Sequence, residues 1–302
     1  MPDRIVTATA ADGSFSIVAG ITTDLVGEMQ RRQQLAPTAS AALGRLLTGA
    51  TLLGASLKGR ERLTLQIAGD GPLRGLVADA HLNGPAQIGA RGYARHPYVD
   101  IPLNERGKFD VGGAVGRGYL QVTRSFEVGQ PYVGIVELVS GEIGDDISSY
   151  LATSEQIPSV VALGVLANPA GIKASGGIVA QVLPGAHERA IAMLEERAGA
   201  MPPVTTQIDR GASAEDLARA LSGELPMRFT RAYDARFTCT CSRERVESAL
   251  LGLGRDELRK IAAEQPQTEV VCEFCKEGYD FSREAVEALA ARLEARESSG
   301  PG

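Results

Sequence analysis

The sequence predicts an α+β protein with a mainly antiparallel N-terminal sheet domain, a helical linker and a small C-terminal domain organised by cysteines. Three observations support this prediction. Strand-like apolar stretches dominate residues 1–184, and short helical segments broken by Pro and Gly occupy 185–230. All four cysteines of the 302-residue chain lie in two close pairs within 231–302. These ranges are the predicted core domain, linker and cysteine domain.

The first domain begins with a predicted hairpin and a helix. Residues 4–9 and 14–20 are β-rich, and turn residues at 11–13 separate them. Thr22 or Thr23 can cap a helix that reaches about Gln34. The order of these signals predicts an antiparallel pair of strands followed by a covering helix.

A second helix and a run of strands follow. Pro37 opens a helix predicted to end near Leu57, with one apolar stripe along it. Gly69–Pro72 is read as a hairpin turn, because a phosphate-binding loop would need a lysine and a following helix. Residues 96–118 are rich in turn residues and are expected to be a loop. The stretches that read as strands are 63–67, 73–80, 86–93, 119–123 and 132–138.

The end of the first domain combines a helix with two apolar strands. Residues 143–154 have a helical pattern, and 160–167 and 178–183 read as strands, with Gly176–Gly177 expected in the turn between them. Asp145–Asp146 could be a catalytic carboxylate pair. Their place at the start of a helix favours interaction with the helix dipole instead.

The predicted linker contains short helices with few apolar residues. Residues 186–200 form one amphipathic helix, and Ser213 has the sequence of a second helix start. Short helices with little core of their own are marginal in water. We therefore expect this segment to fold only against its neighbours.

The cysteine domain alternates short strands and helices. A strand at 228–233 leads into it, and helices are predicted at 242–251 and 255–264. A strand at 269–271 returns to the second cysteine pair, and Ser282 caps a last helix. The two cysteine pairs thus flank the middle helices.

The cysteines form a Cys-x-Cys pair, Cys239 and Cys241, and a Cys-x-x-Cys pair, Cys272 and Cys275. Four thiolates at such spacing suit one tetrahedral Zn²⁺. The three histidines are far away in sequence, so a mixed site is not expected. A structural zinc, a redox role, and free or disulfide-bonded cysteines all remain open at this point. The closeness of the Cys-x-Cys sulfurs favours the redox role.

Composition excludes several function classes. The formal net charge is −6, which argues against nucleic acid as the main partner. We find no nucleophile elbow, Walker loop or zinc-protease motif, and therefore do not expect an enzyme. The sequence also has no apolar run long enough for a membrane span and no visible signal peptide, so we expect a cytoplasmic protein without membrane contact.

The cysteine pattern resembles that of a redox-regulated heat-shock holdase family, the 33-kDa chaperonin. The chain mass of 31.7 kDa is similar to that of the family. The resemblance extends over most of the chain in the same order. The stretches that carry it are Cys239–Arg245, Cys272–Cys275, Gln66–Arg74, Leu76–Asp79 and Ser154–Pro158.

The resemblance implies an ATP-independent chaperone that binds unfolding proteins under oxidative and heat stress. At rest it would hold one zinc ion on Cys239, Cys241, Cys272 and Cys275. Oxidation by peroxide with heat, or by hypochlorous acid, would release zinc and form the disulfides Cys239–Cys241 and Cys272–Cys275. The family also implies a homodimer in the oxidised form. Client-binding residues do not transfer one by one.

Two hypotheses of other classes remain. A constitutive adaptor stapled by zinc would keep its metal under mild oxidant. A thiol oxidoreductase would turn over disulfide substrates and would leave Cys239 dispensable.

Overall fold

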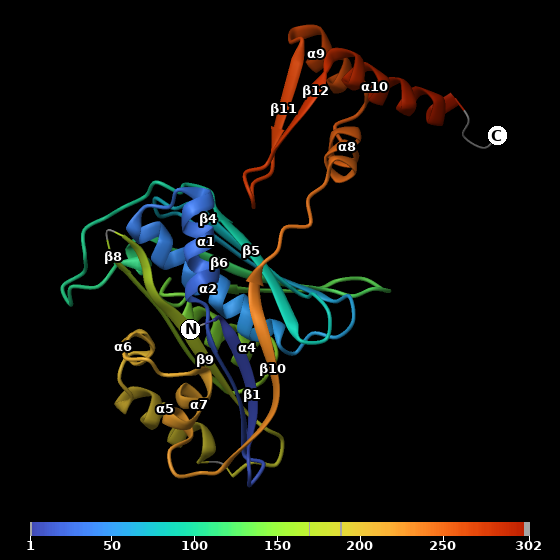
Figure 1. The fold of residues 1–302 in the computed structure, drawn as a ribbon. Coiled ribbons are helices and arrows are strands. Elements are labelled where there is room, and N and C mark those ends of the chain that lie inside the picture. Colours follow the sequence, from blue (N-terminus) through green and yellow to red (C-terminus); the bar gives the residue numbers. More distant parts are fainter. Residues whose placement is uncertain (1, 169, 188, 299–302) are drawn as a thin grey trace. The chain divides into compact units, whose positions relative to one another are not determined.

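The computed structural model describes residues 2–168, 170–187 and 189–298. The chain forms two compact units, Met1–Thr238 and Cys239–Gly302, and Figure 1 shows the elements of each. The α+β prediction is confirmed, with a large sheet and helices in the first unit and helices around a hairpin in the second. None of the helices in the described ranges is both long enough and apolar enough to cross a membrane.

A buried helix, α2 (Pro37–Gly54), is the centre of the first unit. Nearly all of its residues are buried, and it packs on both halves of the sheet, from β3, β4 and β5 to β8 and β9. A helix that is apolar on all sides must be covered on all sides. Its regular turns end at Gly54, and the predicted continuation to Leu57 is a tighter turn in which the Leu57 N–H bonds the Gly54 carbonyl at 3.1 Å.

The sheet has ten strands in the order β7-β6-β3-β4-β5-β10-β1-β2-β9-β8. Every neighbouring pair is antiparallel except β5 and β10. The strands are β1 Arg4–Ala10, β2 Phe15–Ile21, β3 Arg62–Gly69, β4 Gly75–Leu82, β5 Gln87–Ala94, β6 Gly118–Ser125, β7 Tyr132–Glu137, β8 Ser159–Asn168, β9 Gly171–Val182 and β10 Met227–Phe237.

Strand β10 comes late in the sequence but lies in the middle of this sheet. Ile5 of β1 pairs with Tyr233 on one side, and Ala90 of β5 pairs with Phe237 on the other. The predicted boundary at residue 231 therefore falls inside a strand of the first unit. The compact unit continues to Thr238 because β10 is bonded on both edges.

Three helices of the predicted linker cover the outer face of β1, β2 and β9. They are α5 (Ala190–Ala200), α6 (Val204–Asp209) and α7 (Ala214–Ser222). Leu194, Leu217 and Leu221 are buried there, in one cluster with Phe15 and Ile178. These helices have no core apart from the sheet surface that they cover, as the amphipathic pattern predicts.

The glycines expected in a turn between β8 and β9 lie within β9 instead. A Cβ atom at Gly176 would come within 2.5 Å of the Ile208 side chain of α6, and one at Gly164 of β8 would come within 2.6 Å of Thr205. These positions favour glycine because α6 lies directly on the sheet, and at Gly176 the Gly20 carbonyl of β2 is also only 2.4 Å from an added Cβ atom. Sequence periodicity cannot distinguish this use of glycine from a turn.

The remaining helices of the first unit are α1 (Thr23–Gln33), α3 (Val111–Val115) and α4 (Gly144–Thr153). Residues 96–118 were expected to be a loop, and they contain the short α3. Its N-cap is Asp110, whose side chain accepts a hydrogen bond from the Gly113 N–H at 2.9 Å. The many turn residues of this range predicted a loop throughout, and the short capped helix was therefore not predicted.

Asp3 connects the start of the chain to α1 and β10. Its carboxylate accepts hydrogen bonds from the N–H groups of Asp24 at 3.0 Å and Leu25 at 2.7 Å, and so caps α1 from outside the helix. The Ala235 N–H of β10 bonds the Asp3 carbonyl at 3.2 Å. Burial raises the pKa of the Asp3 carboxyl to about 7, although the two N–H donors lower it in part.

This pKa predicts that Asp3 makes the first unit less stable as pH rises from about 4 to 7. The native state keeps a proton that the unfolded state has lost over this window, so the free energy of unfolding falls with pH and is then constant. Carbon-13 NMR of the Asp3 carboxyl should show a midpoint near pH 7. The control is Asp12, whose pKa is lowered by its hydrogen bonds to Ser14. An Asp3 midpoint below pH 5 would contradict the prediction.

Candidate metal centre

The first cysteine pair lies in the extended segment between β10 and α8 (Arg243–Leu251). Ser242 follows the pair and caps α8 by accepting the Arg245 N–H at 3.4 Å. The Arg245 guanidinium donates to the Thr240 carbonyl at 2.6 Å, between the two cysteines. The cap and this contact fix the exit of the segment, and so orient Cys239 and Cys241 toward the same point.

The second pair lies in the loop of a two-stranded hairpin, β11 (Gln267–Val271) and β12 (Gly278–Ser282). The Cys272 N–H bonds the Glu277 carbonyl at 2.9 Å, and the Lys276 N–H bonds the Cys272 carbonyl at 2.8 Å. Lys276 has φ of 61°, which closes the turn. The loop therefore presents Cys272 and Cys275 from one tight turn. The sequence analysis missed β12, which is what makes this loop a hairpin.

The four sulfurs converge on one site. All lie within 4.8 Å of one another, and no disulfide joins the four cysteines. The Sγ atoms of Cys239 and Cys272 are 3.8 Å apart, and those of Cys241 and Cys275 are 3.3 Å apart. A tetrahedral metal with bonds of about 2.3 Å would place its sulfurs about 3.8 Å apart. This cluster can therefore hold one metal ion, and each of these two contacts joins sulfurs of different pairs.

The environment of the sulfurs disfavours free thiolates. Burial raises the pKa of Cys241 and Cys275. The Tyr279 hydroxyl donates a hydrogen bond to the Cys241 sulfur at 3.2 Å and partly offsets this effect at Cys241. That bond also raises the pKa of Tyr279. A cation at the centre would neutralise the negative charge of four neighbouring thiolates and so lower the pKa of the cysteines.

The rest of the second unit is small. It contains α8, α9 (Arg255–Glu264), the hairpin and α10 (Arg283–Ser298). Its buried cluster centres on Phe281, over which the Arg243 guanidinium lies 4.3 Å from the ring centre. The other buried members are Val246, Leu250, Leu258, Ala262, Val286, Leu289 and Ala290. A core of this size gives limited stability without a further constraint.

Asp145 and Asp146, the carboxylate pair considered as a catalytic site, have a structural role. Asp146 is fully buried and accepts N–H bonds from Val139, Ser140, Gly141 and Ile143 at 2.8–3.3 Å. Asp145 accepts the Ser140 hydroxyl at 2.9 Å. Both carboxylates thus hold the loop before α4 rather than face a substrate.

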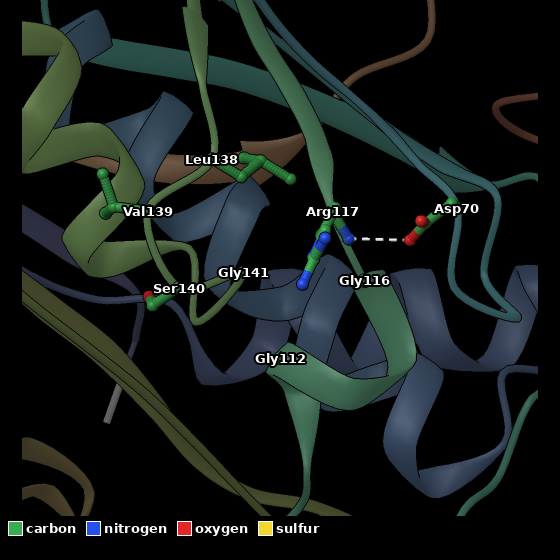
Figure 2. Close-up of a pocket in the computed structure, with 8 residues that line it drawn as sticks. All are labelled: Asp70, Gly112, Gly116, Arg117, Leu138, Val139, Ser140 and Gly141. Atoms are coloured by element: carbon green, nitrogen blue, oxygen red, sulfur yellow. Dashed lines mark hydrogen bonds between the residues drawn. The ribbon is translucent and has the colours of Figure 1, made fainter.

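That loop lines a cavity of about 420 Å³ with Asp70 and Arg117. Figure 2 shows the Asp70 carboxylate accepting the Arg117 backbone N–H, a bond of 2.7 Å. The residues that line the cavity include no histidine or cysteine. The one lining hydroxyl, on Ser140, donates to the Asp145 carboxylate at 2.9 Å and accepts the Glu142 N–H at 3.1 Å, so both of its bonds are made within the loop before α4 and its first turn.

Comparisons with known proteins agree across the chain. The sequence profile of the family described as "Hsp33 protein" matches residues 3–282. The 33 kDa chaperonins of Bacillus cereus (strain G9842) and Bacillus anthracis (strain CDC 684 / NRRL 3495) are 44% identical over 295 residues, which is 97% of this chain and 100% of each relative. The crystal structure of the 33 kDa chaperonin (heat shock protein 33 homolog) from Thermotoga maritima matches with a TM-score of 0.88 and 35% identity, covering 98% of this chain and 100% of that one.

Tyr279 is the residue that sequence reasoning missed at this site. It lies 38 residues from Cys241 in sequence, and only the hairpin brings its hydroxyl to the sulfur. We predict that Tyr279→Phe lowers the affinity for Zn²⁺ about tenfold, because groups that hydrogen-bond a ligand tune the metal. Competition with a chromophoric chelator measures this. Tyr98→Phe, at a residue 71% exposed in the first unit, is the control. Equal affinity in all three proteins would refute the prediction.

Proposed function

The chain belongs to the Hsp33 family of redox-regulated chaperones, and from this premise we propose that it is an ATP-independent holdase switched by its four cysteines. It is a chaperone and not an enzyme. The convergence of Cys239, Cys241, Cys272 and Cys275 on one site is the observation that carries the proposal. The same sulfurs can bind a metal when reduced and cannot do so when oxidised.

The proposed resting form holds one Zn²⁺ on the four thiolates. Soft sulfur ligands in a tetrahedral set favour zinc among the divalent ions that a protein commonly meets. Metal binding in such sites supplies on the order of 10–16 kcal/mol to folding at neutral pH. That is ample for a unit whose own core is small.

Oxidation is proposed to remove these ligands in two steps. One molecule of peroxide takes two electrons from a pair of thiolates, is reduced to water, and leaves one disulfide. Two such steps yield Cys239–Cys241 and Cys272–Cys275 and release Zn²⁺. This pairing is the one that the family resemblance implies, whereas the sulfur contacts at 3.8 Å and 3.3 Å in the reduced arrangement join different pairs.

The switch is proposed to reach the linker through β10. This strand leads directly to Cys239 and follows α5, α6 and α7 in the chain. Loss of the metal-held fold would free the end of β10 and loosen the linker helices, here 185–230. Their release would expose Leu194, Leu217 and Leu221, together with the apolar sheet face of Phe15 and Ile17. Exposed apolar surface of this kind binds unfolded chains.

The proposal also specifies partners and location. The clients are unfolding proteins under oxidative and heat stress, and the oxidised form is a homodimer. Nucleic acid and membrane are not partners, in keeping with the net charge of −6. Four reduced thiolates require a reducing compartment, so the resting protein is placed in the cytoplasm.

The test measures zinc and chaperone activity together. Peroxide at elevated temperature should release one Zn²⁺ per chain, and suppression of the aggregation of a heat-unfolded enzyme should appear in parallel. Cys239→Ser should prevent the first disulfide and weaken metal binding, which separates the switch from a thiol oxidoreductase that does not need Cys239. If zinc stays bound and aggregation is not suppressed, the result would instead support a constitutive adaptor stapled by zinc.

A second prediction concerns the docking of the linker helix α7 on the sheet. Leu217→Ala should destabilise the docking of α7 by about 2–5 kcal/mol, because Leu217 is fully buried against the sheet. The variant should therefore suppress aggregation at a lower temperature or peroxide dose than the parent protein. Leu103→Ala makes the same change at a residue that is 56% exposed and is the control. An unchanged activation threshold in Leu217→Ala would argue against a linker-gated surface.

A further inference from the structure

The exposed apolar side chains of the protein are concentrated on one hairpin. Seven of the eleven large apolar residues that are exposed in the described ranges lie between Tyr119 and Val139. This segment contains β6, β7 and their connecting loop, the green hairpin that projects from the sheet in Figure 1. Val128 at its tip is 87% exposed, and Ile135 in β7 is 59% exposed. Such a concentration marks an interaction site.

Strand β7 is also a free edge of the ten-stranded sheet. Its register with β6 places Ile135 opposite Gln121 and Val133 opposite Thr123. The Leu138 N–H bonds the Gly118 carbonyl at 2.9 Å, which fixes the phase of the ladder. Alternation along an antiparallel pair then turns the N–H and C=O groups of Val133, Ile135 and Glu137 away from β6.

These six outward groups have no hydrogen-bond partner within residues 2–168, 170–187 and 189–298. A row of unpaired backbone groups on an edge strand is a template for one more strand. The side chains of Val133 and Ile135 stand beside it on the exposed face of the sheet, next to Tyr119, which is 52% exposed. The chemistry at this edge therefore suits an extended polypeptide with apolar side chains at alternate positions.

The usual protections against such pairing lie only at the two ends of β7. Pro131 precedes the strand and Glu137 ends it, whereas residues 132–136 contain no charged side chain or proline and the β6–β7 register runs without a bulge. Strand β8 at the opposite edge differs, because α5 and α6 pack on its face. The linker helices make no such contact with β7 among those that the structure describes.

We propose that the open edge of β7 binds an extended apolar segment of an unfolding client as an added antiparallel or parallel strand. This inference rests on the proposed holdase function and deepens it by naming where part of the client binds. Three residues offer few hydrogen bonds, so the edge alone binds weakly. Clients are retained when a second surface, uncovered by the linker, binds the same chain.

Two substitutions block the edge in different ways. Ile135→Lys places a charge beside the added strand, and Ile135→Pro removes an outward N–H without removing a bond to β6. Gln66→Lys is the matched control. Gln66 is exposed in β3, in the same row across the sheet as Gln121 and Ile135, but two strands from the edge.

The probe is a fluorescent peptide of alternating threonine and valine with a lysine at each end. Both Ile135 variants should bind it about tenfold more weakly than the parent protein, while Gln66→Lys binds it equally well. A peptide N-methylated at alternate residues has the same side chains but lacks the bonding N–H groups, and should not bind. Because α5 and α6 pack on β8 and not on β7, the loss of peptide affinity caused by Ile135→Lys should be the same in reduced and oxidised protein.

The client assay uses the oxidised full-length proteins, with thermal unfolding to show that each variant is folded. Ile135→Lys should suppress aggregation several-fold less than Gln66→Lys at equal zinc release. Equal suppression by both, with normal activation, would overturn the edge inference and leave the holdase function intact. Absence of activity in the parent protein would instead reject the holdase function. Hydrogen-exchange protection of the Val133 and Ile135 amides by the peptide would then still decide whether the edge binds a strand.

A second copy of this chain is the other candidate occupant. Sedimentation of the oxidised proteins distinguishes it from a client segment. If Ile135→Lys abolishes a dimer that Gln66→Lys retains, while peptide affinity is unchanged, β7 is an interface between copies and the proposal is wrong.

Discussion

The convergence of four cysteine sulfurs is the constraint on which the second unit depends. Its apolar cluster around Phe281 is small, and the hairpin loop and the β10–α8 segment are joined at the sulfurs. Thiolates so close together repel one another unless a cation binds them. In the proposed zinc form, the bonds that stabilise the unit are therefore the bonds that an oxidant can remove. Stability and sensitivity to oxidation then have the same chemical origin.

Strand β10 connects the sheet to the cysteine cluster along the chain. It is paired on both edges, by β1 and β5, and its last residue is separated from Cys239 by Thr238 alone. The linker helices precede it and are buried only against the sheet. Elements with no core of their own lie at the low end of local stability. In the proposed switch, their position next to β10 in the chain gives an oxidation event a short path to a large apolar surface.

The apolar side chains of the sheet are buried to different extents in its different parts. Around α2 both halves are covered, and consecutive residues Ile5 and Val6 of β1 are buried on opposite faces. The outer face near β8 is covered by the linker helices, which the proposed switch would release. One face of the β6–β7 hairpin carries exposed apolar side chains, with the charged Glu127 in the loop and Glu137 at the end of β7. For most proteins this would be an aggregation hazard, whereas for a chaperone it is a binding surface.

Local patterns in the sequence specify most of the elements and the cysteine cluster. Alternation located the strands of the sheet but not β12, Ser213 and Ser242 located helix starts, and the spacing of the cysteines predicted that their four sulfurs lie together, because each of these signals acts within a few residues. Tertiary structure alone decided that β10 enters the sheet beside β5, that Gly176 makes room for α6, and that Tyr279 reaches Cys241. It also decided which edge of the sheet is left open. These features depend on contacts between residues far apart in the chain, and no local pattern of residues encodes such pairings.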